Sequence, residues 1–236
     1  MKLDDPEVVS AEYADESRFL RRRAAFATST GPSALDTLFD AVAAVSPRRY
    51  LEVGCGPGDM AARVLQELGA EVVALDLSPR MVHLTRERGV DARVGDVQEL
   101  PFEDASFDCA VAAWMLYHVP DLERGLAELA RVLRPRGRLV AATNSFENMR
   151  ELWGLVGRDP RKEAIPFFAE NAEEPLCRHF GSVERRDVVG EMAFSRDAAR
   201  DYLANTIAHT HLADRLPDFD EPLMVTRHMT IFVATK

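Results

Sequence analysis

The chain has 236 residues, with 29 Lys and Arg against 39 Asp and Glu, which gives a formal net charge of −10. This length predicts one ordinary domain, and 47% hydrophobic with 29% charged residues argues against a disordered or fibrous protein. An acidic surface repels phosphate backbones, so we expect a small-molecule partner and no nucleic acid.

The sequence contains no signal for a membrane or for export. Its longest uninterrupted apolar stretch, Cys109 to Tyr117, has nine residues, far fewer than the roughly 20 of a membrane-spanning helix. The acidic start lacks the basic end and apolar run of a secretory signal. Three cysteines leave an odd thiol and no CxxC spacing. We therefore expect a cytoplasmic protein without a membrane partner or a metal.

The N-terminal part predicts helices, and the central part predicts a sheet. Apolar residues recur at helical spacing from about residue 10 to 45, with a break near Gly31 and Pro32, which predicts two helices. After Pro47, strand-like runs alternate with helical stretches at 58–69, 79–89 and 121–133. The strand-like runs are RYLEV, VVALDL, ARVGD, FDCAVAAW and RLVAATNS. This alternation predicts a doubly wound α/β fold: a Rossmann-like, mostly parallel sheet of about seven strands, with helices on both faces and an N-terminal helical cap.

The second half of the chain has looser patterning. Residues 147–157, 166–180 and 196–212 show helical spacing, and SVERRDVV and RHMTIFVAT read as strands. We divide the single domain into a cap (1–47), a ligand-binding core (48–145), and lid segments with C-terminal strands (146–236). The long connections in this last part are typical of lids or binding segments.

A strand-to-helix turn with three glycines, Gly54, Gly56 and Gly58, is the most informative motif. Glycine lacks a Cβ, so backbone N–H groups can approach a ligand there, and the following helix directs its free N–H groups to the same crevice. The spacing is GxGxG with Pro57 inside it, whereas dinucleotide sites use GxGxxG to hold a pyrophosphate. A nucleotide-like ligand without pyrophosphate is therefore favoured.

Acidic residues follow at the ends of the next two strands. Asp76 stands where an acid of this architecture accepts hydrogen bonds from a ribose, and Asp96 ends the third strand. Taken alone, Asp76 could cap a helix, although Ser78 is the better N-cap, and Asp96 could belong to a turn. Glu52 lies inside an apolar strand, where an ionised carboxylate needs a partner.

These segments resemble a known family. The series LEVGCGPG, VVALDLSPRMV, VGDVQELPFEDASFDCAVAAWMLYHVPD and LARVLRPRGRLVAAT is similar to the class I S-adenosylmethionine-dependent methyltransferases, and within them to the type 11, small-molecule family. The similarity covers about residues 49–145 well and the rest loosely. Arg136 departs from the pattern, since members usually have a glycine there.

The resemblance implies sites for the two ends of S-adenosylmethionine. Gly54, Gly56 and Gly58 would lie under its methionine part, with Glu52 near the ammonium group. The backbone carbonyls of Ala112 and Ala113, at the end of the fourth strand, would lie near the same ammonium group.

The resemblance also implies which residues would bind the nucleoside end of the cofactor. Asp76 would bind the ribose hydroxyls, and Leu77 and Met81 would flank the adenine. Asp96 would accept a hydrogen bond from the exocyclic amine, and Val97 would offer a backbone N–H.

Candidate catalytic residues rest on weaker signals. His118 follows the fourth strand, where the family has the mouth of its active site, and Tyr13 is similar to an N-terminal tyrosine that many relatives fold over the cofactor. Packing is the alternative for both. His209 and His211 lack the i, i+4 spacing of helical zinc motifs. The basic run Arg21–Arg23 is surrounded by acids and is expected to be solvated.

We therefore expect methyl transfer to a small-molecule acceptor, driven mainly by proximity and in-line alignment, because the cofactor itself supplies the reactive methyl group. Two alternatives stay open. One is an NAD-dependent oxidoreductase on a similar fold, and the other is a protein that binds S-adenosylmethionine without transferring its methyl group.

Overall fold

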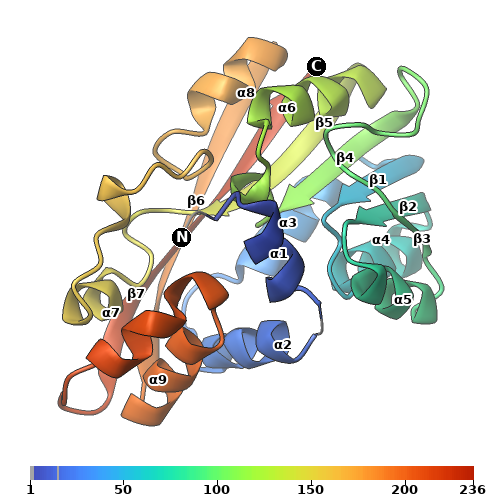
Figure 1. The fold of residues 1–236 in the computed structure, drawn as a ribbon. Helices are drawn as coiled ribbons and strands as arrows, with labels where there is room; N and C mark the ends of the chain where they lie inside the picture. The colour runs from blue at the N-terminus through green and yellow to red at the C-terminus, as the bar shows by residue number, and fades with distance from the viewer. Residues whose placement is uncertain (1–2, 15) are drawn as a thin grey trace.

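The sheet has seven strands in the order β3-β2-β1-β4-β5-β7-β6 (Figure 1). The computed structural model describes residues 3–14 and 16–236; Met1, Lys2 and Asp15, which belong to the predicted cap, lie outside the described residues. The first five strands in this order are parallel to their neighbours, and β7 runs antiparallel to β5 and β6. The strands are β1 (Arg49–Val53), β2 (Glu71–Asp76), β3 (Asp91–Val94), β4 (Phe107–Ala113), β5 (Leu133–Asn144), β6 (Ser182–Phe194) and β7 (Leu223–Thr235).

Helices cover both faces of this sheet and its carboxyl edge (Figure 1). The α-helices are α1 (Pro6–Glu12), α2 (Ser17–Ala24), α3 (Ala34–Ala43), α4 (Asp59–Leu68), α5 (Pro79–Glu87), α6 (Leu122–Val132), α7 (Arg150–Leu155), α8 (Glu173–His179) and α9 (Arg196–Ala204). Short 3-10 helices are η1 (Ala25–Thr28), η2 (Leu116–His118), η3 (Pro160–Lys162) and η4 (Ile207–Arg215). The predicted doubly wound α/β fold with its helical N-terminus is confirmed.

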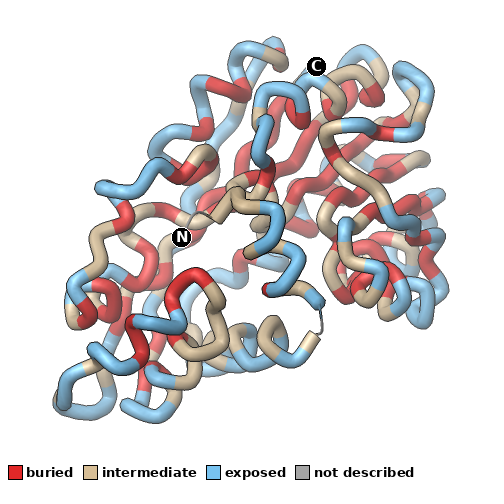
Figure 2. Tube along the Cα trace, viewed as in Figure 1, coloured by how far each residue is buried: buried red, intermediate tan, exposed pale blue. Residues whose placement is uncertain are grey.

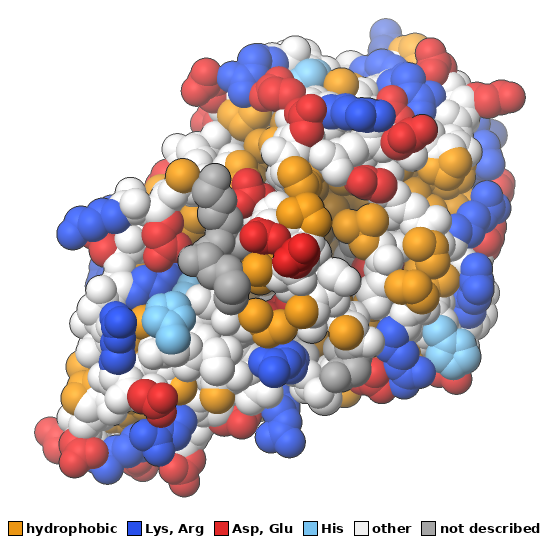
Figure 3. Space-filling model, in the orientation of Figure 1, with side chains coloured by type: hydrophobic (Ala, Val, Ile, Leu, Met, Phe, Trp, Pro, Cys, Tyr) orange, Lys and Arg blue, Asp and Glu red, His pale blue; other side chains and the backbone are white. Residues whose placement is uncertain are grey.

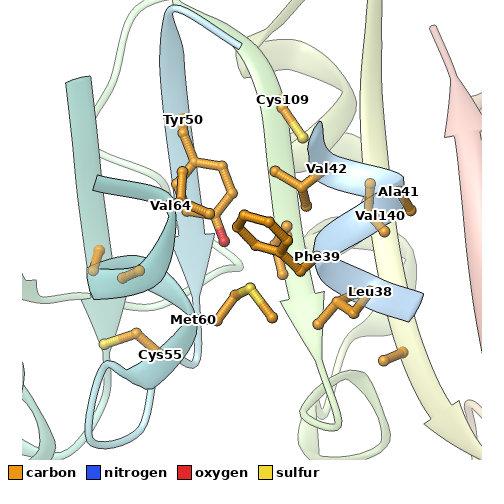
Figure 4. Packing of buried hydrophobic residues seen from close by; sticks show 14 of the residues in the cluster. Leu38, Phe39, Ala41, Val42, Tyr50, Cys55, Met60, Val64, Cys109 and Val140 are labelled. Carbon is orange, nitrogen blue, oxygen red and sulfur yellow. The ribbon is translucent and has the colours of Figure 1, made fainter. Parts of the chain in front are cut away.

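Alternation along β1 explains why the sheet is buried on both faces. Successive side chains of a strand point to opposite faces, so Tyr50 joins the core beneath α3 and α4 while Leu51 joins the core beneath α6. Phe39 and Met60 lie near the Tyr50 ring in the first of these cores (Figure 4). Figure 2 shows buried residues along the central strands and exposed ones on the outer helices. By the same alternation, Glu52 lies on the face of Tyr50.

Several predicted elements differ from the structure in detail: for example, the helix predicted at 166–180 covers only Glu173–His179, and β3 ends at Val94, before Asp96. The N-terminal region has three α-helices and η1 where we predicted two helices. The predicted helix at 196–212 is split, because the Asn205 side chain donates to the Asp201 carbonyl oxygen at 2.8 Å and ends α9. The strand β5 begins before the predicted Arg138, and Arg136 takes a left-handed φ of 66° within it, which is the conformation that favours the glycine of the family pattern.

Among the described residues, no helix combines the length and apolar character needed to cross a membrane.

Candidate functional site

A cavity of about 1170 Å³, here called the large cavity, opens at the carboxyl ends of β1, β2 and β4 and is also lined by α1 and α2. Ligands bind at this edge in open parallel sheets. Small-molecule sites measure roughly 300–1,000 Å³, so the cavity has room for a cofactor and a second molecule. In Figure 3, hydrophobic and acidic side chains occupy the middle of the face over α1, with most Lys and Arg nearer its margins.

All three motif glycines adopt backbone conformations that disfavour other residues. Their φ angles are 64° at Gly54, 53° at Gly56 and 81° at Gly58, in the left-handed region. Gly54 and Gly56 line the large cavity. A Cβ on Gly56 would meet no atom of the described residues within 4 Å, so the space beside Gly56 is open to a ligand, although its N–H and carbonyl oxygen bond to Asp76 and Thr85.

Gly58 serves packing instead. A Cβ at this position would lie 2.6 Å from Thr85 Oγ1, so α4 can approach α5 this closely only because Gly58 has no side chain. Gly58 is not among the residues that line the large cavity. The structure therefore brings two of the three predicted glycines to the cavity and places the third behind them.

Asp76 lines the large cavity and also holds the glycine loop. Its Oδ2 accepts from the Gly56 N–H at 2.8 Å, and its Oδ1 accepts from the Ser78 N–H at 2.9 Å. Burial raises the pKa of Asp76, and these two N–H donors oppose that shift. An ionised carboxylate has about four acceptor positions, so Asp76 keeps capacity for two ligand hydroxyls. Ser78 caps α5 as predicted, with Oγ accepting from the Met81 N–H at 3.3 Å.

Asp96 and Val97 lie at the same edge, one strand further on. Both line the large cavity together with Gln98. The Gln98 amide Nε2 donates to both Asp96 oxygens, at 3.1 and 2.9 Å, and Gln98 Oε1 accepts from the Asp121 N–H at 2.9 Å. Gln98, which we did not predict, therefore fixes the Asp96 carboxylate in place.

The two residues predicted to flank the adenine lie in different environments. Leu77 is 58% exposed and lines the large cavity. Met81 is fully buried and does not belong to the lining. Met81 stands in the first turn of α5, and its side chain is one of the largest that the protein buries completely. The structure thus brings Leu77 to the cavity but not Met81.

Glu52 is a carboxyl group buried at the floor of the large cavity, with 3% of its surface exposed. The Tyr50 hydroxyl donates to Oε2 at 3.2 Å. Burial raises the pKa of Glu52 to about 8, against the lowering effect of the Tyr50 hydroxyl. No cationic side chain among the described residues forms an ion pair with Glu52. Buried carboxylates normally have a cationic partner, so this position suits a positively charged ligand group.

Tyr13 and His118, the two predicted catalytic residues, contact each other. Their side chains meet at 3.1 Å between the Tyr13 hydroxyl and His118 Nε2, with the rings edge to face. His118 Nδ1 lies 2.7 Å from the Leu3 carbonyl oxygen, and the Tyr13 carbonyl oxygen accepts from Ser78 Oγ at 2.7 Å. Burial raises the pKa of Tyr13 well above its usual value and lowers the pKa of His118 to about 4. Both residues line the large cavity, as does Ala113 at the end of β4.

A second cavity of about 130 Å³, the small cavity, adjoins Tyr13 and His118. Its walls come from α1, η2 and the part of the chain predicted to contain the lid (146–236), and they include Trp153, Phe168 and Tyr202. His209 also lines it, and burial lowers the pKa of His209 to about 3. Within residues 3–14 and 16–236, no group of three or more His, Cys, Asp and Glu side chains could hold a metal ion.

The prediction for Arg22 was wrong. Its side chain is only 14% exposed, forms an ion pair with Glu12, and donates to the Asn205 carbonyl oxygen at 2.8 Å. Arg22 lines both cavities. Its partner lies ten residues away on a different helix, so no local spacing in the sequence could have indicated the pair.

The match to known proteins agrees with this geometry. Residues 51–141 match the family described as "Methyltransferase domain". This part of the chain belongs to the class I S-adenosylmethionine-dependent methyltransferases. The match covers most of β1, all of β2, β3 and β4, and most of β5, and so includes the carboxyl ends of β1, β2 and β4 that line the large cavity.

Relatives carry the same family name. A phthiotriol/phenolphthiotriol dimycocerosates methyltransferase of Mycobacterium leprae is 32% identical over 67% of this chain and 62% of that protein. A demethylmenaquinone methyltransferase of Deinococcus radiodurans is 39% identical over 40% of this chain and 42% of that protein. The chain spans about half the length of the curated relatives that it matches.

Solved structures share the fold. A putative methyltransferase from Bacillus halodurans superposes with a TM-score of 0.66 over 87% of this chain and 99% of that one, at 20% identity. The comparisons do not favour the oxidoreductase alternative.

Proposed function

We propose that this protein transfers the methyl group of S-adenosylmethionine to a small-molecule acceptor that binds beside Tyr13 and His118. The observation that carries the proposal is that the glycine loop, Asp76 and Asp96 line one cavity, which also reaches the Tyr13–His118 pair. The groups proposed to bind the nucleoside and the Tyr13–His118 pair thus line a single cavity.

The residues present fit this cofactor. Glu52 is a buried carboxyl without a cationic partner among the described residues, and the methionyl ammonium group would supply one. Asp76 retains acceptor capacity for the ribose hydroxyls, and Leu77 offers an apolar surface for the adenine. Gly56 leaves the space beside it open to the ligand. When bound, the cofactor supplies an electrophilic methyl group on a sulfonium.

The contacts of His118 determine its tautomer. Nδ1 faces the Leu3 carbonyl oxygen, which can only accept, so Nδ1 carries the proton. Nε2 is then the acceptor for the Tyr13 hydroxyl. The Tyr13 oxygen keeps lone pairs that can accept a hydrogen bond from the O–H or N–H of an acceptor molecule.

The pair acts first by orienting the acceptor. With a pKa of about 4, His118 is neutral at physiological pH and is a weak base. A proton on the acceptor atom becomes strongly acidic as that atom bonds to the methyl group. Tyr13 can then take this proton while passing its own to His118 Nε2. Alignment of the acceptor contributes most of the rate, since orientation can supply roughly 7–11 kcal/mol.

The aromatic side chains of the small cavity favour an acceptor with an apolar or aromatic part. Trp153, Phe168 and Tyr202 offer such surfaces next to the Tyr13–His118 pair. The names of the two curated relatives refer to a menaquinone precursor and to lipid alcohols or phenols, which are compounds of this kind.

Calorimetric titration with S-adenosylhomocysteine, and separately with NADH, tests the cofactor. We expect saturable binding of the first and none of the second; binding of NADH alone would reject the proposal. Incubation with methyl-labelled S-adenosylmethionine and small-molecule extracts then tests transfer. Label in an organic-soluble product supports the proposal, while cofactor binding without labelled product in any extract supports the non-transferring alternative.

A further inference from the structure

The large cavity extends beyond the predicted cofactor contacts, along the sheet toward β7. Its wall there includes Phe26, Leu38, Trp114 and Met229, all apolar. Arg227 is part of the same wall. These residues lie on the face of the sheet that α3 covers.

Arg227 is a buried cation without an anionic partner. Its side chain lies on β7 with 4% of the residue exposed, and no carboxylate among the described residues forms an ion pair with it. Burial alone lowers the pKa of Arg227. Buried charges are normally paired, because an unpaired charge loses its hydration without compensation.

Among the described residues, only Nη2 of the three guanidinium nitrogens of Arg227 has a hydrogen-bond partner. Nη2 donates to the carbonyl oxygens of Thr30, at 3.0 Å, and Pro32, at 2.5 Å. Nε is buried without a hydrogen-bond partner. Nη1 has no partner among the described residues either, so the guanidinium retains donors for a ligand.

The local backbone is shaped to hold this arginine. A Cβ on Gly190, which pairs with Arg227 across β6 and β7, would lie 2.1 Å from the Thr30 carbonyl oxygen and 2.6 Å from Arg227 Nη2. The Thr30 N–H donates to the Glu191 carbonyl oxygen at 2.8 Å. Gly190 therefore lets the loop before α3 approach the strand and fix the guanidinium at the wall of the cavity.

Two further donors in the lining are unsatisfied. Ser29 Oγ and Trp114 Nε1 are both buried without a partner, and both residues line the large cavity. Ser29 precedes Thr30, whose carbonyl oxygen accepts from Arg227, and the backbone N–H of Trp114 donates to the Ala142 carbonyl oxygen of β5, next to β7. Among the described residues, unsatisfied donors thus lie on three residues of one wall, one of which is cationic, and they form a suitable environment for an oxyanion.

Building on the proposed function, we infer that the methyl acceptor carries an anionic oxygen group, such as a carboxylate, attached to an apolar body, and that Arg227 binds this group. The sheet order separates this group from the cofactor's own carboxylate. That carboxylate is on the same carbon as the ammonium group and would stay near Glu52 on β1. Arg227 is on β7, three strands away, or about 14 Å at the usual strand spacing.

The test measures binding of 3-phenylpropanoate and of its neutral amide to the protein saturated with S-adenosylhomocysteine. We expect the carboxylate to bind at least tenfold more tightly, and Arg227→Gln to remove this preference. Arg227→Lys keeps the charge and should keep part of the preference. Arg48→Gln makes the same charge change at an exposed position and should leave the preference intact.

Equal binding of the two probes to the wild-type protein, or binding of neither at millimolar concentration, overturns the inference without affecting the proposed function. A comparison of S-adenosylhomocysteine with 5′-methylthioadenosine, which lacks the amino-acid part, identifies the source of the anion. If Arg227→Gln weakens the binding of S-adenosylhomocysteine but not of 5′-methylthioadenosine, Arg227 binds the cofactor's carboxylate and the inference about the acceptor is wrong. Failure of the wild-type protein to bind S-adenosylhomocysteine rejects the proposed function instead.

Discussion

The carboxylate of Asp76 accepts a hydrogen bond from the backbone N–H of Gly56 at 2.8 Å. This bond joins the end of β2 to the turn that follows β1. The side chain proposed to hold the ribose thus also fixes the backbone proposed to lie under the methionine part, so its loss affects both.

Asp76→Ala should weaken S-adenosylhomocysteine binding about a hundredfold, because hydrogen bonds to a charged group contribute about 1.5–3 kcal/mol each. Asp76→Asn keeps one oxygen for the Gly56 N–H and should weaken binding less. Calorimetric titration measures both affinities, with Asp40→Ala, an exposed acid on α3, as the control. An unchanged affinity in Asp76→Ala would contradict the assignment.

Glu52 makes stability depend on pH. Burial raises its pKa from 4.5 to about 8, so between these values the folded protein binds a proton that the unfolded chain does not. The free energy of unfolding therefore falls as pH rises through this window. Glu52→Gln should remove this contribution, so its stability relative to wild type should increase with pH by more than about 1 kcal/mol. Urea unfolding at a series of pH values measures this difference in stability, with the exposed Glu103→Gln as control. If the free energies of unfolding of wild type and Glu52→Gln changed in parallel with pH, the raised pKa of Glu52 would be excluded.

Cofactor binding should release a proton from Glu52. An ammonium group beside the carboxyl favours its ionised form, so binding of S-adenosylhomocysteine near pH 7 should be accompanied by proton release to the buffer. Titrations in buffers of different ionisation enthalpy measure this release, which Glu52→Gln should abolish. The same release in both proteins would assign the proton to another group.

Tyr13→Phe should lower kcat at least about tenfold and leave the affinity for S-adenosylhomocysteine nearly unchanged. This minimum loss is smaller than the roughly 10²–10⁴-fold of acid–base groups, because His118 is a weak base. His118→Gln should act similarly. Because burial lowers the pKa of His118 to about 4, the wild-type pH–rate profile should show no inflection near 6.5. Steady-state kinetics with an identified acceptor test these outcomes, and full activity of Tyr13→Phe would assign the pair a packing role only.

Gly58→Ala should destabilise the fold more than Gly56→Ala. Both substitutions place a side chain in a left-handed conformation, at about 1–2 kcal/mol each, but only at Gly58 does the new Cβ overlap with Thr85. Adding Thr85→Ala should therefore recover more stability in the Gly58 variant than in the Gly56 variant. Urea denaturation of the four proteins measures this coupling, and equal recovery would contradict the packing role.

The sequence predicted the part of the site that is made by consecutive strand ends. Asp76 and Asp96 stand at the ends of apolar runs that predict strands, and a parallel sheet places the carboxyl ends of its strands along one edge. Met81 was assigned by its position in a motif, but its place in the first turn of α5 directs it into the core. Arg22 and Arg227 depend on contacts between segments far apart in the chain, which periodicity does not report.

The contacts of α1 and the residues next to it affect how molecules leave the site. Leu3 contacts His118, Tyr13 contacts Ser78, and Glu12 accepts from the Ile207 N–H at 2.6 Å. These bonds attach one short segment to three separate regions around the cavity. Departure of S-adenosylhomocysteine past this segment would require these bonds to open together, so its dissociation rate would report the detachment of the segment.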